Sequence, residues 1–115
     1  MTPDDLREYC LALPQSTETF PFSEGLSVFK TSGNGKVFAL SALGDQPFSV
    51  SLKCDPEDSI ALREEFPAIT PGYHLNKKHW ITIVLDDGVP DELVEQLISG
   101  SHDLVRPKVA RSRRA

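Results

Sequence analysis

The sequence predicts one α+β domain, an antiparallel sheet of four to six strands with the N-terminal and C-terminal helices packed on one face. Short segments in the middle of the chain alternate apolar and polar residues and are joined by turn sequences, which is typical of hairpin-linked strands. Segments at both ends repeat apolar residues at helical spacing. The length of 115 residues is sufficient for one hydrophobic core.

The first predicted helix begins at Pro3 and ends before Pro14. Thr2 is a preferred N-cap residue, proline suits the first helical position, and Asp5 is attracted to the positive end of the helix. One stripe of this helix is apolar and is expected to be buried. It consists of Leu6, Tyr9, Cys10 and Leu13.

A loop and three strands are predicted to follow. Residues 15–25 indicate a structured loop whose aromatic side chains, Phe20 and Phe22, we expect to pack against the core. The strands are expected at residues 26–31, 36–42 and 48–53. Residues 32–35 favour a hairpin turn, because Gly and Asn tolerate positive φ. Residues 48–53 alternate strictly, which predicts one buried face and one wet face.

The second half of the chain predicts a helix over 56–66, a strand over 79–85 and a third helix that begins near Pro90. Gly100 is expected to kink or interrupt this last helix. Its apolar stripe is predicted to be Leu93, Leu97 and Leu104, with Val94, Ile98 and Val105 beside it. Since the first and third helices each need one partner surface, we expect both on the same face of the sheet.

Composition limits the compartment and the kind of protein. The apolar runs are far shorter than the ~20 residues that a membrane span needs, and the acidic start does not resemble a secretory signal. Cys10 and Cys54 do not make a disulfide framework, so we expect two free thiols. These features favour a soluble, cytoplasmic monomer with no membrane partner.

The charge of the chain is distributed unevenly. The total is −5, but residues 1–105 hold all 17 acids and seven bases, a net charge of −10. The remaining segment holds five bases and no acid: Arg106, Lys108, Arg111, Arg113 and Arg114. We therefore predict a domain over 1–105 and a basic tail over 106–115. Such a tail either contacts a polyanion or only solubilises the chain, and both interpretations stay open.

Several motifs along the chain resemble the MmcQ/YjbR family of small bacterial proteins. They are Pro21-Phe22, Val28-Phe29-Lys30, Lys53-Cys54-Asp55-Pro56, Thr70-Pro71-Gly72-Tyr73-His74-Leu75-Asn76-Lys77-Lys78-His79-Trp80, Val89-Pro90-Asp91-Glu92-Leu93 and Ser101-His102-Asp103-Leu104-Val105. The resemblance implies a frataxin-like (CyaY-like) α+β sandwich, which agrees with the predicted order of elements. It also implies DNA binding through hairpin wings, although fold alone does not establish function.

The segment 72–80 has the most functional chemistry. It gathers Tyr73, His74, Asn76, Lys77, Lys78, His79 and Trp80. Lysines supply charge to phosphates, Asn can bond a base edge, and aromatic rings offer stacking surfaces. Alternatively, Tyr73 and Trp80 are core anchors and the lysines are merely solvated. Lys77 and Lys78 share one surface only if they lie in a loop.

We therefore expect a non-catalytic protein that binds DNA through non-specific phosphate contacts. The expected contacts are Lys77, Lys78, Arg106, Lys108, Arg111, Arg113 and Arg114, with Lys36 and His79 as weaker candidates. The alternative is a protein- or small-ligand-binding module without catalytic activity. Its pocket would lie near Lys53, Tyr73, His74 and Trp80.

Catalytic and metal sites receive less support from the sequence. A Cys54 thiolate paired with a histidine would need an electropositive setting, and Asp55 opposes one. The histidines have no metal-ligand spacing, and the glycines near Lys36 lack the phosphate-loop pattern. Asp4 and Glu8 on the first helix are too few for a strong oxygen-ligand site. We expect no catalytic residue, no metal and no cofactor.

Overall fold

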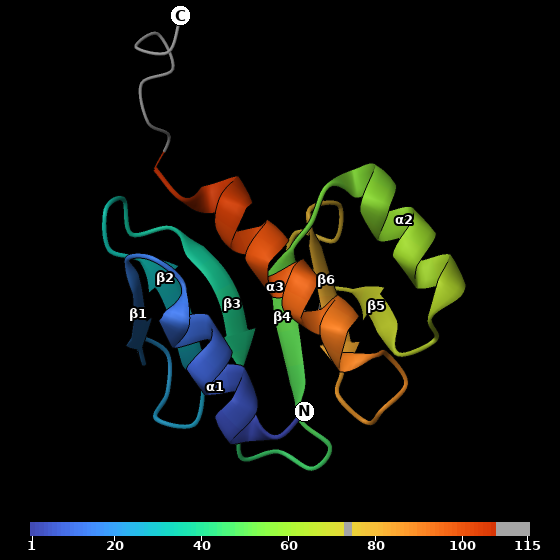
Figure 1. Cartoon of the computed structure of the whole chain (residues 1–115), viewed down its shortest axis with the longest axis horizontal. Coiled ribbons are helices and arrows are strands. Elements are labelled where there is room, and N and C mark those ends of the chain that lie inside the picture. The colour runs from blue at the N-terminus through green and yellow to red at the C-terminus, as the bar shows by residue number, and fades with distance from the viewer. Residues whose placement is uncertain (73–74, 108–115) are drawn as a thin grey trace, which may run out of the picture.

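The computed structural model describes residues 1–72 and 75–107. The described residues form three helices and six strands, which Figure 1 labels: α1 Pro3–Ala12, β1 Ser16–Thr19, β2 Ser27–Thr31, β3 Val37–Ser41, β4 Ser49–Lys53, α2 Pro56–Glu65, β5 Ile69–Pro71, β6 Trp80–Val84 and α3 Asp91–Val105. The strands form one sheet in the order β1-β2-β3-β4-β6-β5, and each neighbouring pair is antiparallel. The predicted α+β class and strand number are confirmed.

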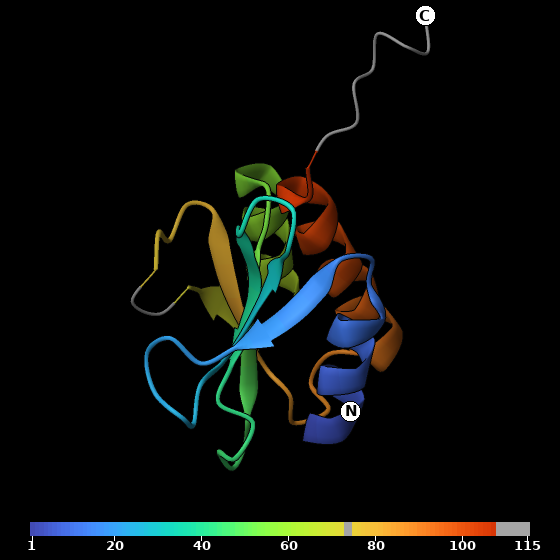
Figure 2. The same cartoon turned by 90° about the vertical axis from the view of Figure 1, so that its left-hand side faces the viewer.

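Helices α1 and α3 cover the same face of the sheet, as the sequence predicts (Figure 2). Helix α2 lies at one edge, beside β5 (Figure 1). No helix of the described residues covers the other face of the sheet (Figure 2), which is called the open face below. None of the helices in the described ranges is long and apolar enough to cross a membrane.

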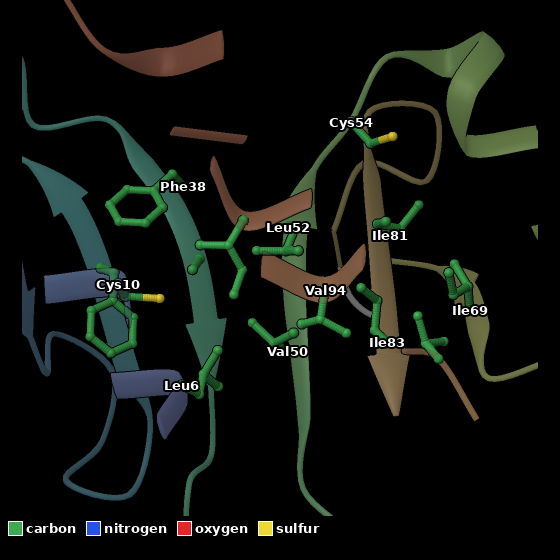
Figure 3. Packing of buried hydrophobic residues seen from close by; sticks show 14 of the residues in the cluster. Leu6, Cys10, Phe38, Val50, Leu52, Cys54, Ile69, Ile81, Ile83 and Val94 are labelled. Atoms are coloured by element: carbon green, nitrogen blue, oxygen red, sulfur yellow. The ribbon is translucent and has the colours of Figure 1, made fainter. Parts of the chain in front are cut away.

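The hydrophobic core lies between the sheet and the two terminal helices (Figure 3). Cross-strand register places Phe29, Ala39, Leu52 and Ile81 in one row over β2, β3, β4 and β6. From α1, the predicted stripe supplies the fully buried Leu6 and Cys10, with Tyr9 and Leu13 partly buried. The Tyr9 hydroxyl lies 2.7 Å from the Ser99 hydroxyl and joins α1 to α3.

Two strands are present where the sequence predicts loops. Strand β1 is polar throughout, so it lacks the apolar alternation by which a strand is recognised. It pairs with β2 at the edge of the sheet, and Glu18 there accepts from Ser27 and pairs with Arg7. Strand β5 has three residues and includes Pro71, which is tolerated because β5 is the other edge.

The expectation that Phe20 and Phe22 pack against the core is wrong. Their exposed fractions are 50% and 73%. Both lie in the loop between β1 and β2, which projects on the side of the open face (Figure 2). The core is already filled by side chains from the strands and from α1 and α3, so these rings stay at the surface.

The predicted stripe of α3 is only partly confirmed. The buried residues of this helix are Val94, Ile98, Ser101, His102 and Val105. Leu93 and Leu97 are partly buried, whereas Leu104 is 46% exposed. The helix turns Ser101 and His102 toward the core, because both side chains bond to main-chain carbonyls there. Gly100 does not interrupt the helix, which is continuous to Val105.

Helix α3 therefore ends where the predicted domain ends, and residues 108–115 of the predicted tail lie outside the described part of the chain. The boundary between a domain over 1–105 and a tail over 106–115 stays a prediction.

Candidate functional site: the open sheet face and its lysine end

All five lysines of the described chain lie toward one end of the sheet, where β2 and β4 finish and β3 and β6 begin. Antiparallel topology produces this gathering, because the ends of alternate strands and the starts of the others meet at the same edge. We call this region the lysine end. It consists of Lys30, Lys36, Lys53, Lys77 and Lys78.

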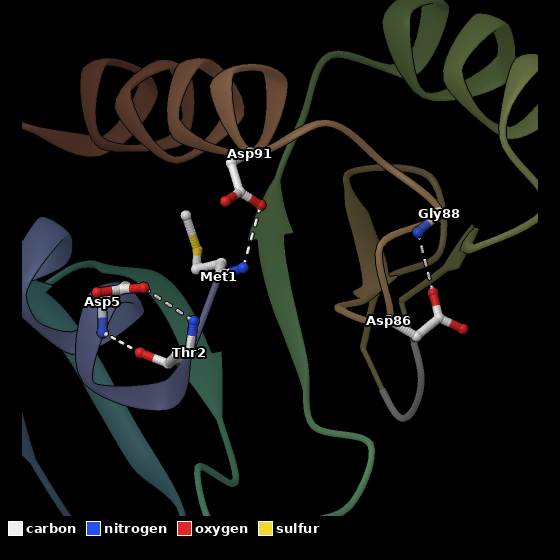
Figure 4. Close-up of polar contacts among 6 residues, drawn as sticks. All are labelled: Met1, Thr2, Asp5, Asp86, Gly88 and Asp91. Atoms are coloured by element: carbon white, nitrogen blue, oxygen red, sulfur yellow. Dashed lines mark hydrogen bonds and ion pairs between the residues drawn. The ribbon is translucent and has the colours of Figure 1, made fainter.

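The opposite end of the sheet is acidic, and we call it the acidic end. It consists of Asp4, Asp5, Asp45, Asp86, Asp87, Asp91 and Glu92. Figure 4 shows part of it: the Met1 amino group lies 3.2 Å from Asp91, and Asp86 accepts from the N–H of Gly88. Thr2 and Asp5 form a reciprocal capping box, and hydrogen bonds from the Thr2 backbone and then its side chain lower the pKa of Asp5.

Lys77 and Lys78 lie in a turn that leads into β6, and both are exposed. The Asn76 side-chain oxygen accepts from the Lys78 N–H at 2.9 Å. The main-chain carbonyl of Asn76 accepts from the backbone N–H groups of His79 and Trp80. The segment is therefore a loop, which is the condition under which both lysines can share one surface. Asn76 is occupied in shaping this turn, so it is a poor candidate for reading a base edge.

Trp80 begins β6 opposite Lys53, the last residue of β4. It is partly buried, and the adjoining loop backbone is close to it, since a Cβ on Gly72 would come within 2.6 Å of the Trp80 Cβ. A glycine is therefore needed at position 72. The structure brings Lys53 and Trp80 together on the open face, while Tyr73 and His74, the other two residues of the predicted pocket, lie outside the described residues.

A groove of about 470 Å³ lies on the open face, lined by residues of the loop after β1 and of the loop before β6. Register places Val28, Leu40, Ser51 and Thr82 in one row on this face. The groove is apolar with hydroxyl groups on its floor. It is lined by Phe22, Leu26, Leu40, Ser41, Ala42, Ser49, Ser51, Leu75 and Thr82.

Sequence reasoning missed this groove. One signal was available, because the alternation in 48–53 predicts that Ser49, Ser51 and Lys53 share a wet face. The walls could not be identified, since Phe22 and Leu75 are far apart in the sequence and both come from loops. The groove lies beside the predicted Lys53–Trp80 position rather than on it.

The hairpin between β2 and β3 is not a free wing. The Asn34 amide donates to the Val105 carbonyl at 2.8 Å, and the Asn34 side-chain oxygen accepts from the Thr31 hydroxyl. Gly33 packs against Pro107, where a Cβ would meet the proline ring at 2.7 Å. These contacts fix the hairpin, and with it Lys36, beside the end of α3.

Arg106 follows α3 at this same place, and its guanidinium pairs with Asp103 at 3.0 Å. Its side chain remains about half exposed, so the pair is a weak surface ion pair. The other predicted tail contacts, Lys108, Arg111, Arg113 and Arg114, lie outside the described residues.

The thiols and the Ser101-His102-Asp103 segment have structural surroundings. Burial raises the pKa of Cys10 to about 12, and burial followed by the charges of Asp58 and Asp55 raises the pKa of Cys54 to about 11. Neither cysteine is paired in a disulfide. Within 1–72 and 75–107, no group of three His, Cys, Asp or Glu side chains could hold a metal ion.

Ser101 and His102 connect α3 to the rest of the fold. The Ser101 hydroxyl accepts from the Lys53 N–H at 2.9 Å and donates to the Phe38 carbonyl at 2.6 Å. His102 Nε2 lies 2.8 Å from the Pro14 carbonyl oxygen, and its ring meets that of Phe38 edge to face at 5.1 Å. Both side chains therefore hold the helix on the sheet.

The comparisons with known proteins agree with this architecture. A protein from Deinococcus radiodurans, DR2400, has a crystal structure with a TM-score of 0.88 at 45% identity, over 97% of this chain and 86% of that one. A Pseudomonas syringae protein has a TM-score of 0.80 at 27% identity, over 92% of this chain and 100% of that one.

The family of the chain is identified by its relatives in sequence. The uncharacterized protein YbdF of Escherichia coli O157:H7 is 39% identical over 100 residues, which are 86% of this chain and 80% of YbdF. The uncharacterized protein YjbR of Escherichia coli K12 is 31% identical over 102 residues, which are 89% of this chain and 85% of YjbR. The model of the YjbR family matches residues 11–104. The chain therefore belongs to the YjbR family.

Proposed function

We propose that this YjbR-family protein is a non-catalytic binding protein that contacts the phosphates of DNA at its lysine end. The observation that carries the proposal is that all five described lysines lie at one end of the sheet, while a group of seven carboxylates lies at the other. A chain of negative total charge would be repelled by DNA if its acids were spread evenly. Here the acidic end lies away from the surface that would meet phosphate.

One group of acids limits where DNA can lie. Asp55, Glu57 and Asp58 are at the start of α2, directly after Lys53. The Cys54 N–H donates to the His79 carbonyl, so these acids also lie near the turn of Lys77 and Lys78. Phosphates are therefore expected at the exposed Lys36, Lys77 and Lys78 rather than at Lys53. Helix α3 ends beside the β2–β3 hairpin that carries Lys36, since Asn34 contacts Val105 there. We therefore propose that the five bases of 106–115 extend the contact.

The surroundings of the nucleophilic groups support the non-catalytic part of the proposal. Reactive thiols need a lowered pKa, and those of Cys10 and Cys54 are raised. Ser101 and His102 are buried and bonded to main-chain groups, so neither reaches a substrate in solution.

The free thiols also support a cytoplasmic location, where cysteines stay reduced. We propose a monomer as well, because the exposed large apolar residues of the described chain are dispersed over several elements: Phe20, Phe22, Ile60 and Leu104. Sedimentation equilibrium of the full chain tests the monomer, and a dimer at micromolar concentration would contradict it.

A salt titration of duplex DNA binding tests the proposed function. If about four to six bases touch phosphate, the slope of log K against log salt is roughly −4 to −5. Deleting residues 106–115 should remove most of this slope, since five bases and no acid are lost. Replacing Lys77 and Lys78 with Ala should weaken binding further, by the same factor on any DNA sequence.

Arg63→Gln is the matched control, because it removes a positive charge from α2 outside the lysine end. It should leave the affinity for DNA unchanged. The proposal fails if random duplex does not bind at ~50 mM salt, where non-specific contacts are strong. It also fails if binding survives both the tail deletion and the double lysine substitution.

The groove favours a second candidate function, the binding of a small ligand with an apolar body and an anionic group. Its volume of about 470 Å³ lies within the range of ligand sites, and Lys53 ends the strand that forms its floor. Such a ligand would bind with little dependence on salt, because one ion pair contributes about −1 at most to the slope of log K against log salt. The same salt titration therefore separates the two functions.

A further inference from the structure

The groove has an exposed aromatic wall. Phe22 lines it and is 73% exposed, although burying a phenylalanine side chain away from water is favourable. The ring stands in the loop between β1 and β2, over a floor that includes Leu40 and the hydroxyls of Ser49 and Ser51. An aromatic ring beside an apolar floor with hydroxyl groups is suited to a flat ring that also carries polar edges.

The charged residues around the groove differ between its two ends. Leu75 forms one wall and is followed closely in the same loop by Lys77 and Lys78. Lys53, which belongs to the lysine end, lies on the same strand and the same face as Ser51. On the other side, Glu24 follows Phe22 in its loop and Asp45 lies in the loop after β3. An anion is therefore attracted to one end of the groove only.

We propose that the groove takes an unpaired nucleobase, stacked on Phe22, while the adjoining phosphates lie against Lys77 and Lys78. This inference rests on the proposed function and adds that the preferred nucleic acid is single-stranded. In a duplex the bases are stacked on each other and paired, so a duplex can use the lysines but cannot fill the groove. A single strand can do both, and stacking on aromatic side chains is largely independent of base identity.

The acids beside the groove make the expected site short. A strand that continued past Phe22 would bring its phosphates toward Glu24 and Asp45. One or a few nucleotides would therefore be held in the groove, and the rest of the strand would lie toward the lysine end. The contact differs from an extended channel that follows a long single strand.

Fluorescence anisotropy with the full chain tests the inference, using a labelled thymine strand and a duplex of the same length at ~50 mM salt. The single strand should bind at least about fivefold more tightly than the duplex. Phe22→Ala should weaken single-strand binding by about fivefold or more and leave duplex binding unchanged. The matched control is Phe20→Ala, the same change in the same loop at a ring that does not line the groove.

A second variant fills the groove instead of opening it. Ser49 lies on the floor at the start of β4, so Ser49→Phe should occupy the space of the base. It should reduce single-strand binding to the level of the duplex. Urea unfolding of each variant checks that the fold is retained, and Phe22→Ala is expected to retain it because the ring is mostly exposed.

The outcomes separate this inference from the proposed function. If neither DNA form binds, the proposed function fails and the inference fails with it. If both forms bind equally and Phe22→Ala has no effect, the proposed function stands and the inference is overturned. It is also overturned if an acidic peptide rich in leucine binds the groove more tightly than the single strand, because the occupant would then be a protein segment.

Discussion

Replacing Ser101 with Ala should destabilise the protein far more than the loss of one hydroxyl suggests. Ser101 is 1% exposed, and its hydroxyl bonds both the Lys53 N–H of β4 and the Phe38 carbonyl of β3. Alanine would leave a buried acceptor and a part-buried donor without this partner. A buried unpaired group costs about 1–3 kcal/mol and a part-buried one about 1 kcal/mol, so the expected loss in the free energy of unfolding is about 2–4 kcal/mol.

Urea denaturation followed by circular dichroism measures this loss, and thermal melting should show a fall of roughly 10–20 °C. Ser99→Ala is the matched control on the same helix. Among the described residues, the Ser99 hydroxyl bonds the partly buried Tyr9 hydroxyl, so the cost should be about 0.5–1 kcal/mol. Equal losses for the two variants would refute the bridging role of Ser101.

Ser101→Ala also distinguishes a structural role from a functional one. Below its melting temperature, the variant should bind DNA with unchanged affinity, because the hydroxyl is enclosed between α3 and the sheet. A folded variant that had lost DNA binding would place Ser101 in the site and contradict the account.

Three further predictions concern groups away from the groove. Because the pKa values of Cys10 and Cys54 are raised to about 12 and about 11, both thiols should react with a thiol reagent at pH 8 much more slowly than a free cysteine, and titration in denaturant should find two thiols. Asn34→Ala should cost about 1–2 kcal/mol in urea unfolding, since the side chain bonds the last carbonyl of α3; an unchanged stability would contradict the fixed hairpin. Thr2→Ala should cost about 1 kcal/mol at neutral pH. The pKa of Asp5 is lowered in the folded state, so its stabilising effect is present above the ordinary carboxyl pKa and is lost as pH falls through the folded value; the penalty for Thr2→Ala should therefore shrink in acid, and a constant penalty would contradict the capping box.

The central strands and hairpins could be predicted from the sequence, because their alternation follows the burial that they have. Residues of β4 alternate in the structure as in the sequence, with Val50 and Leu52 buried and Ser51 between them half-buried. The edge strands could not be predicted, since an edge needs no apolar face. Strand β1 is held by main-chain pairing and by Glu18, and neither leaves a periodic signal.

The choice of which face of α3 is buried shows a second limit of prediction from the sequence. Two apolar stripes lie side by side on this helix, and hydropathy favours the leucine stripe. The structure buries the other one more fully, because Ser101 and His102 bond to the carbonyls of Phe38 in β3 and of Pro14 after α1. A polar side chain that is bonded in the core has the same sequence signature as one in solvent, so the choice depends on tertiary partners.

The candidate site was only partly predictable. Lys77 and Lys78 could be named as exposed bases in a loop, and the structure places them so. The gathering of all described lysines at one end follows from strand order, which no local pattern reveals. The groove needs two loops, each from a different half of the chain, to stand on either side of the open face.

Lysine footprinting tests the central claim most directly. The full chain is acetylated with and without saturating DNA at ~50 mM salt, and the rate at each lysine is measured by peptide mass spectrometry. The account predicts that Lys36, Lys77 and Lys78 react more slowly when DNA is bound, and that raising the salt concentration restores their rates. Rates that stay the same at all three lysines when DNA is bound would contradict the account.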